Sequence, residues 1–153
     1  MKKIGSEITQ FLLRQGCVVF ATIDRGGYPH SACKGIVEIE DAGKIYLLDL
    51  YKWKTFANLK RDSHVSITAV DEHKFKGYCI KGKAKIVPRD KIDLALMKAW
   101  EDRLTNRLTQ RVIKNLHEEK GHPRHPEALM PRPEYLIEVD VEEIVNLTPK
   151  HIK

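Results

Sequence analysis

The chain has 153 residues, which is the length of a single domain and enough to bury a core without covalent cross-links. With 42% hydrophobic and 31% charged residues it has a globular composition, and it contains no apolar run long enough to cross a membrane. We therefore expect one domain over residues 1–153, without a signal peptide, in the cytoplasm. The net charge of +6 would favour an anionic partner, although so modest an excess is usually spread over a solvated surface.

The three cysteines, Cys17, Cys33 and Cys79, predict buried, reduced thiols and no disulfide. Their number is odd, no Cys-x-x-Cys pair occurs, and each lies in an apolar or alternating stretch. His122 and His125 lie close together in a proline-rich loop, but no third ligand has the spacing of a metal site. The sequence therefore predicts a surface loop there and no metal site.

The first half of the chain predicts a helix followed by an antiparallel meander. Apolar residues at helical spacing mark a helix that would end at Gly16. The extended segments after it are joined by short glycine-containing turns, which connect antiparallel neighbours. In the second of these segments we expect Cys33 to point inward and Lys34 to lie on the opposite face. The three predicted strands cover residues 17–24, 30–40 and 44–50.

The second half predicts three more strands and one long helix. Residues 64–70 alternate between apolar and polar side chains, and so do residues 78–87, where three lysines would face solvent. A helix follows Pro88, with Asp90 as its expected N-cap. The last strand lies at 135–145, so six strands with added helices predict a closed or nearly closed antiparallel barrel.

The stretch 52–62 combines several cations with an apolar face. At the start of a short helix, Lys54 and Thr55 could meet an anion together with the unpaired backbone N–H groups of the first turn. The alternative is a solvated surface helix, and from these residues alone it is the stronger interpretation. The apolar face, which we expect to pack inward, consists of Trp53, Phe56 and Leu59.

Taken in order, these segments resemble the FMN-binding split-barrel family related to pyridoxamine 5′-phosphate oxidase. The resemblance covers residues 4–88 and the last strand, at 134–147, and its strongest element is the Lys-Thr-x-x-Asn-Leu stretch that begins at Lys54. It implies a mainly β fold with α elements, namely a six-stranded antiparallel split β-barrel with peripheral helices. It also implies a homodimer with FMN at the interface, acting as an oxidoreductase on an unidentified small substrate.

The resemblance further implies which residues bind FMN. Lys54 and Thr55 would hold the phosphate, and Asn58 would support that turn. Lys34 would lie near the flavin, where a cation could stabilise its anionic reduced form. The other implied positions line the ring system and the ribityl chain or cross the dimer interface; they are Ala32, Cys33 and Gly35, then Leu47, Leu48 and Asp49, and from the partner chain Met130 and Pro131.

Two departures from the family limit what the resemblance implies. The helical stretch 101–120 is longer than compact members need, and the C-terminal tail lacks the substrate-phosphate residues of the true oxidase, so we do not expect vitamin B6 oxidation. No side chain stands out as a catalytic acid or base. Three alternatives stay open: a non-catalytic FMN carrier or electron-transfer protein, a barrel that binds a deazaflavin or haem, and a basic nucleic-acid-binding barrel. The last is disfavoured because the strands lack exposed aromatics between their lysines.

Overall fold

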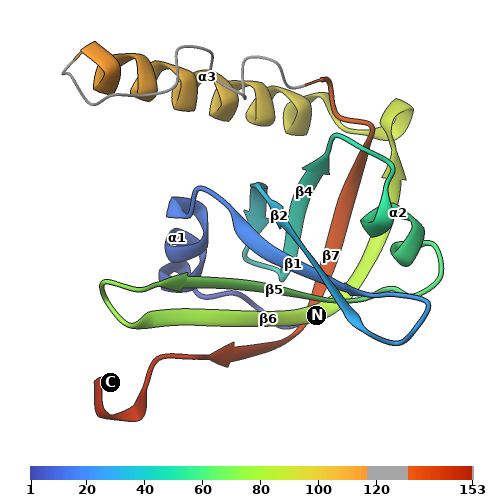
Figure 1. Ribbon diagram of the computed structural model, residues 1–153, viewed down its shortest axis with the longest axis horizontal. Helices are drawn as coiled ribbons and strands as arrows, with labels where there is room; N and C mark the ends of the chain where they lie inside the picture. The colour runs from blue at the N-terminus through green and yellow to red at the C-terminus, as the bar shows by residue number, and fades with distance from the viewer. Residues whose placement is uncertain (117–130, 153) are drawn as a thin grey trace.

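A curled antiparallel sheet of seven strands forms the body of the molecule. The computed structural model describes residues 1–116 and 131–152. Its strands are β1 (Val18–Ile23), β2 (Pro29–Lys34), β3 (Ile36–Glu40), β4 (Lys44–Asp49), β5 (His64–Asp71), β6 (Lys76–Pro88) and β7 (Tyr135–Asn146). The strand order is β2-β1-β5-β6-β7-β4-β3, and the long strands β6 and β7 bend so that the sheet curls into a half-barrel (Figure 1).

The prediction of six strands is wrong, because the predicted segment 30–40 is two strands. β2 ends at Lys34, β3 begins at Ile36, and Gly35 lies between them. β2 pairs with β1 at one edge of the sheet, whereas β3 pairs with β4 at the other edge. At Gly35 the chain therefore passes from one edge of the sheet to the other. The mainly β, antiparallel split-barrel fold with peripheral helices is confirmed.

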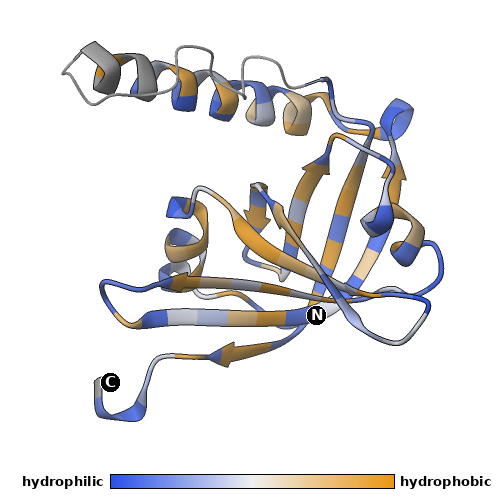
Figure 2. Ribbon diagram, viewed as in Figure 1, coloured by the Kyte–Doolittle hydropathy of each residue, from blue (hydrophilic) through white to orange (hydrophobic). Residues whose placement is uncertain are grey.

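The core forms because alternate residues of each strand point to the same side of the sheet. In β5, Val65, Ile67 and Ala69 are buried, as the alternation predicts. In β6 the predicted lysines alternate with buried residues and are exposed. Hydrophobic residues accordingly concentrate on the strands (Figure 2).

Three α-helices flank the sheet in the described part of the chain: α1 (Ser6–Arg14), α2 (Lys54–Leu59) and α3 (Leu94–Leu116). α2 contacts β1 and β6, while α3 contacts β3 and extends well beyond the sheet (Figure 1). Over residues 1–116 and 131–152, no helix is long and apolar enough to cross a membrane. The predicted end of the long helix at Gly121 lies outside the described residues, as do His122 and His125.

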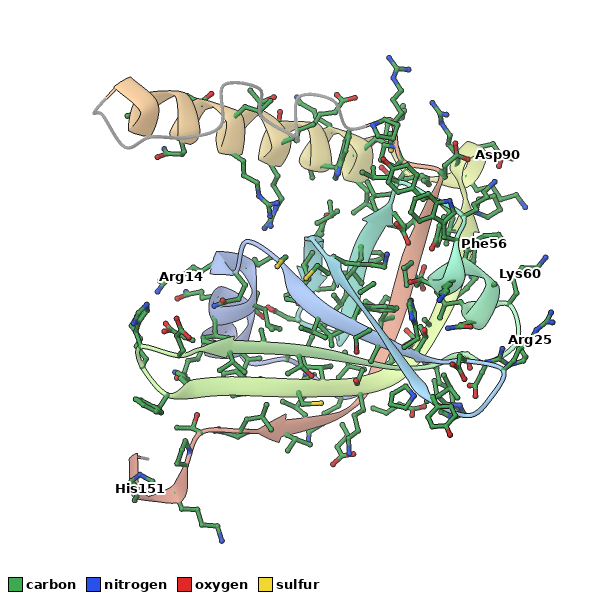
Figure 3. The ribbon with its side chains drawn as sticks, in the orientation of Figure 1. Arg14, Arg25, Phe56, Lys60, Asp90 and His151 are labelled. Carbon is green, nitrogen blue, oxygen red and sulfur yellow. The ribbon has the colours of Figure 1, made fainter. Side chains whose placement is uncertain are left out.

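The predicted N-cap of the long helix is wrong. Asp90 lies in a short 3₁₀ helix, Arg89–Lys91, ahead of α3 (Figure 3). Asp93 has the capping role instead, since its carboxylate accepts a hydrogen bond from the backbone N–H of Ala95 at 2.7 Å. The start of α3 is further fixed by apolar packing of Trp100 and its neighbours against a small core cluster around β3 and β4.

Candidate functional site

A cavity of 710 Å³ lies around Gly35, where the chain passes from one edge strand of the sheet to the other. Small-molecule sites in proteins have volumes of about 300–1,000 Å³, so this cavity has the size of a ligand pocket. Its walls come from β2, the start of β3, the end of β4, the start of α2 and one face of α3. Most of the binding residues that the resemblance implied line it: Ala32, Cys33, Lys34, Gly35, Leu48, Asp49, Lys54 and Thr55.

Three of the remaining implied residues, Leu47, Asn58 and Pro131, do not line this cavity. Leu47 is fully buried in the main core. Asn58 lies behind the wall, where its side-chain amide donates a hydrogen bond to the Thr22 hydroxyl at 3.0 Å and ties α2 to β1. Pro131 is exposed, and Met130 lies outside the described residues. A contribution of those two across a dimer interface stays a prediction.

The start of α2 brings Lys54 and Thr55 to the cavity because the buried side of this helix is anchored in the fold. Thr55, Asn58 and Leu59, at helical spacing, are its buried residues. Phe56 packs edge-to-face on Tyr135, with ring centroids 4.9 Å apart. α2 is thus fixed on both β1 and β7.

The predicted inward packing of Trp53 is wrong, whereas that of Leu59 is confirmed. Trp53 precedes the helix and so does not belong to its buried face; it is 71% exposed. It stacks on Tyr51 with ring centroids 4.8 Å apart, and both rings belong to the cavity lining. A pair of exposed aromatic side chains therefore borders the pocket.

Lys34 is fixed in the cavity wall by a buried polar network. Its ammonium lies 2.5 Å from Asp49 Oδ2, and the two side chains are only 9% and 11% exposed. The hydroxyl of Tyr135 donates a hydrogen bond to the same oxygen at 2.5 Å. Burial, and then the bond to Asp49, raise the pKa of Tyr135 well above its usual range, so its hydroxyl remains a donor. No pattern along the chain indicated that Tyr135 would contact this network.

The predicted inward orientation of Cys33 is wrong. In the β1–β2 register Val18 is paired with Lys34 and Val19 with Cys33. Val18 is buried while Val19 and Cys33 are exposed, so Lys34 has the inward position. The expectation of buried thiols fails for Cys17 also, which is exposed, while Cys79 is partly buried.

We expect Cys17 and Cys33 to react with a thiol reagent in the folded protein, and Cys79 to react more slowly. Partial desolvation of the thiol, and then its hydrogen bond with the neighbouring Cys33 thiol, raise the pKa of Cys17, so its labelling should accelerate as the pH rises above neutral. Labelling with a chromogenic disulfide, with Cys17→Ser and Cys33→Ser as matched controls, measures each rate. Labelling of all three thiols only after denaturation would contradict these exposures.

α3 supplies part of the cavity that sequence reasoning missed. Trp100, Arg103, Leu104 and Arg107 line it. Arg103 donates a hydrogen bond to the backbone carbonyl of Ile36 at 2.8 Å, and Arg107 donates one to the carbonyl of Gly16. One feature of the sequence could have indicated these residues: two arginines stand one helical turn apart, beside the apolar stripe of the predicted helix.

Comparison with known proteins agrees with this architecture. Residues 4–147 match the pyridoxamine 5′-phosphate oxidase family. The chain is similar to the crystal structure of HupZ from Group A Streptococcus, at 20% identity and a TM-score of 0.68, over 95% of this chain and 94% of that one. For a putative pyridoxamine 5′-phosphate oxidase from Lactobacillus delbrueckii the identity is 18% and the TM-score 0.61, over 95% of each chain.

A third similar structure is an F420 reductase, at 14% identity and a TM-score of 0.56, over 93% of this chain and 98% of that one. At such identities the structural likeness shows the fold alone. A search of curated proteins found no match. The family match spans nearly the whole length of the chain, and the fold is a split barrel. The chain therefore belongs to the pyridoxamine 5′-phosphate oxidase family.

Proposed function

We propose that the protein binds FMN in the cavity and is an oxidoreductase acting on a small substrate. The observation that carries this proposal is that Lys54 and Thr55 meet the residues of β2 and the end of β4 around one cavity. A cation beside a hydroxyl is a donor set suited to a phosphate. Apolar residues suited to a ring system complete the lining; among them are Ala32, Ile36, Val37 and Leu48. Membership of a family related to a flavin-dependent oxidase supports the assignment.

In this proposal the protein binds and orients, while the flavin, when bound, supplies hydride-transfer chemistry. Lys54 and Thr55 would hold the phosphate, and Asn58 steadies their helix through its bond to Thr22. Lys34, held by Asp49, places a cation in the wall where it can favour an anionic ligand.

The direct test is titration of the purified protein with FMN, followed by flavin fluorescence and by absorbance after dialysis. We expect about one FMN per chain, which is the stoichiometry of one cavity in each subunit. Rapid reduction of the bound flavin by NADH or NADPH in stopped-flow experiments would identify the protein as an enzyme. Absence of this rapid reduction would favour a flavin carrier. Failure to retain FMN, with a deazaflavin or haem retained instead, would overturn the assignment of the cofactor.

We further propose a homodimer in which the partner chain covers the aromatic pair at the cavity. Tyr51 and Trp53 are 45% and 71% exposed, although stacked aromatic rings beside a pocket are typical interface residues. We expect light scattering to give the mass of two chains, and Trp53→Ser to weaken the dimer at least about tenfold, because anchor residues contribute about 2 kcal/mol or more. Val70→Ser, at a 57% exposed strand residue outside the cavity lining, is the control. A wild-type monomer at micromolar concentration would refute the proposal.

A further inference from the structure

We infer that Cys17 and Cys33 form a redox-active dithiol beside the cavity, which a small disulfide oxidises to an intramolecular disulfide bond. Cys17 immediately precedes β1, and Cys33 lies near the end of the neighbouring edge strand β2, where it also lines the cavity. The inference goes beyond the proposed function and does not require that FMN binds. It rests on the register of the strands, on the exposure of the two thiols and on the contact between them.

The register of β1 and β2 places the two cysteines on one face of the sheet. Cys33 pairs with Val19. Side chains two residues apart along a strand point to the same side, so Cys17 shares the face of Val19 and Cys33. All three residues are accordingly exposed, and the two thiols hydrogen-bond to each other. The two sulfur atoms are therefore neighbours in the reduced protein.

The strand geometry allows a bond between these two cysteines after a small movement of the backbone. They occupy diagonal positions on neighbouring strands, and such residues are about 7–8 Å apart. A disulfide usually joins Cα atoms about 4.4–6.8 Å apart, so a shift of about 1 Å is sufficient. Cys17 precedes the first paired residue, Val18, and β2 pairs with β1 alone in the described sheet. Neither segment is held by strands on both sides, and the shift breaks no ladder.

The third cysteine is too far away to compete. Val19 pairs with Thr68, and Thr68 pairs with Cys79. Cys79 therefore lies in the same row of the sheet as Cys33, but three strands away. Neighbouring strands are about 4.8 Å apart, which separates these two residues by roughly 14 Å. Two strand spacings, or about 10 Å, already separate Cys17 from Cys79, so only the pair Cys17 and Cys33 is within reach of a disulfide.

The oxidant is a small disulfide such as oxidised glutathione, and the reaction is a pair of thiol–disulfide exchanges. The thiolate of one cysteine attacks a sulfur of the reagent, forms a mixed disulfide and releases one small thiolate. The thiolate of the other cysteine then attacks the protein sulfur of the mixed disulfide, which forms the protein S–S bond and releases the second small thiolate. The protein loses two electrons and two protons, and the reagent takes them up as two small thiols.

Oxidation would change the wall of the cavity and should be reversible. The thiol of Cys33 belongs to the cavity lining, so its conversion to a disulfide replaces a weak hydrogen-bond donor there. The new bond would also tie the start of β1 to the end of β2. Exposed disulfides are typically the labile ones, and we expect excess thiol to reduce this bond again.

The experiment uses the reduced wild-type protein without added FMN, and oxidised glutathione is the probe. After alkylation of the remaining thiols, tryptic mapping locates the bond, because cleavage after Arg25 separates the two cysteines. We expect the loss of two of the three free thiols, with peptides 15–25 and 26–34 recovered as one cross-linked species. Reduction should separate the two peptides. Cys79 should be alkylated, and the protein should run as a single chain on a non-reducing gel.

The serine variants test the two steps separately. Cys79→Ser is the matched control and should form the same cross-link as the wild type. Cys33→Ser lacks the second thiol, so Cys17 should accumulate the mixed disulfide with glutathione. Cys17→Ser should accumulate the same adduct at Cys33.

Several results would overturn the inference. They are glutathione adducts on Cys17 and Cys33 of the wild type without a cross-link, a cross-link that forms only in urea, an equal amount of cross-link to Cys79, and a bond that joins two chains. All of them are read from the wild type, so the test holds even if a serine variant does not fold. Because no FMN is added, the result is also independent of whether the proposed cofactor binds.

Discussion

Lys54→Ala combined with Thr55→Ala is expected to weaken FMN binding at least about a hundredfold. A hydrogen bond to a charged group contributes about 1.5–3 kcal/mol, and two such bonds at the lower end of that range correspond to this factor. The lower end applies because Lys54 is exposed, and solvent screens its charge. Quenching of flavin fluorescence on titration measures the dissociation constants of both proteins.

The control for this variant is Lys60→Ala. Lys60 belongs to the same basic stretch, projects outward at the end of α2 (Figure 3) and does not line the cavity. It should bind FMN as the wild type does, because the variant loses only an exposed charge and the contact of the ammonium with the Phe56 ring, 5.8 Å from the ring centroid, both outside the cavity. Equal affinities in all three proteins would show that the phosphate is not held at Lys54 and Thr55.

Asp49→Ala is expected to destabilise the fold by about 3–5 kcal/mol, because it leaves the buried Lys34 ammonium without its counter-charge. It also deprives the fully buried Tyr135 hydroxyl of its acceptor. Urea unfolding in the absence of FMN measures the free energy without a contribution from ligand binding. Adding Lys34→Met to Asp49→Ala should recover part of the loss, since the uncompensated charge is then gone.

The matched control is Glu143→Ala, which removes a carboxylate from an exposed ion pair. Glu143 lies 3.0 Å from Lys81, and the two side chains are 54% and 52% exposed. Its removal should cost less than about 1 kcal/mol, because solvent screens such pairs. If Asp49→Ala costs no more than this control, the network in the cavity wall does not hold the fold together.

Periodicity in the sequence was sufficient for much of the sheet. Clear alternation in β5 and β6 identified their buried faces, because one side of each strand carries apolar residues and the other polar ones. It failed in β2, whose residues are small or polar on both faces, so the relative orientation of Cys33 and Lys34 could not be decided. The break at Gly35 was missed because a lone glycine between two extended runs gives no turn signal.

The site was predictable only in its local parts. The resemblance to the split-barrel family implied that residues of β2, β4 and α2 surround one ligand, and most of them do line one cavity. Asp49 and Tyr135 meet across 86 positions of sequence, and Arg103 and Arg107 reach the cavity through the docking of α3 on β3. Such contacts are set by tertiary packing, which periodicity along the chain does not encode.

The cavity lies between the two edges of the split barrel, so a bound molecule would fill the gap between them. β2 and β3 are the two edges of the sheet, and edge strands present a row of backbone groups that no neighbouring strand pairs. Residues of both edges line the cavity around Gly35, so a molecule bound there would contact both edges. Ligand binding and the rigidity of the two edge strands are then thermodynamically linked. If the ligand stabilises the two edges against each other, a substitution that stabilises them in the same way raises the affinity for the ligand by the same free energy. Substitutions at 38–40, the part of β3 that does not line the cavity, would therefore also alter ligand affinity.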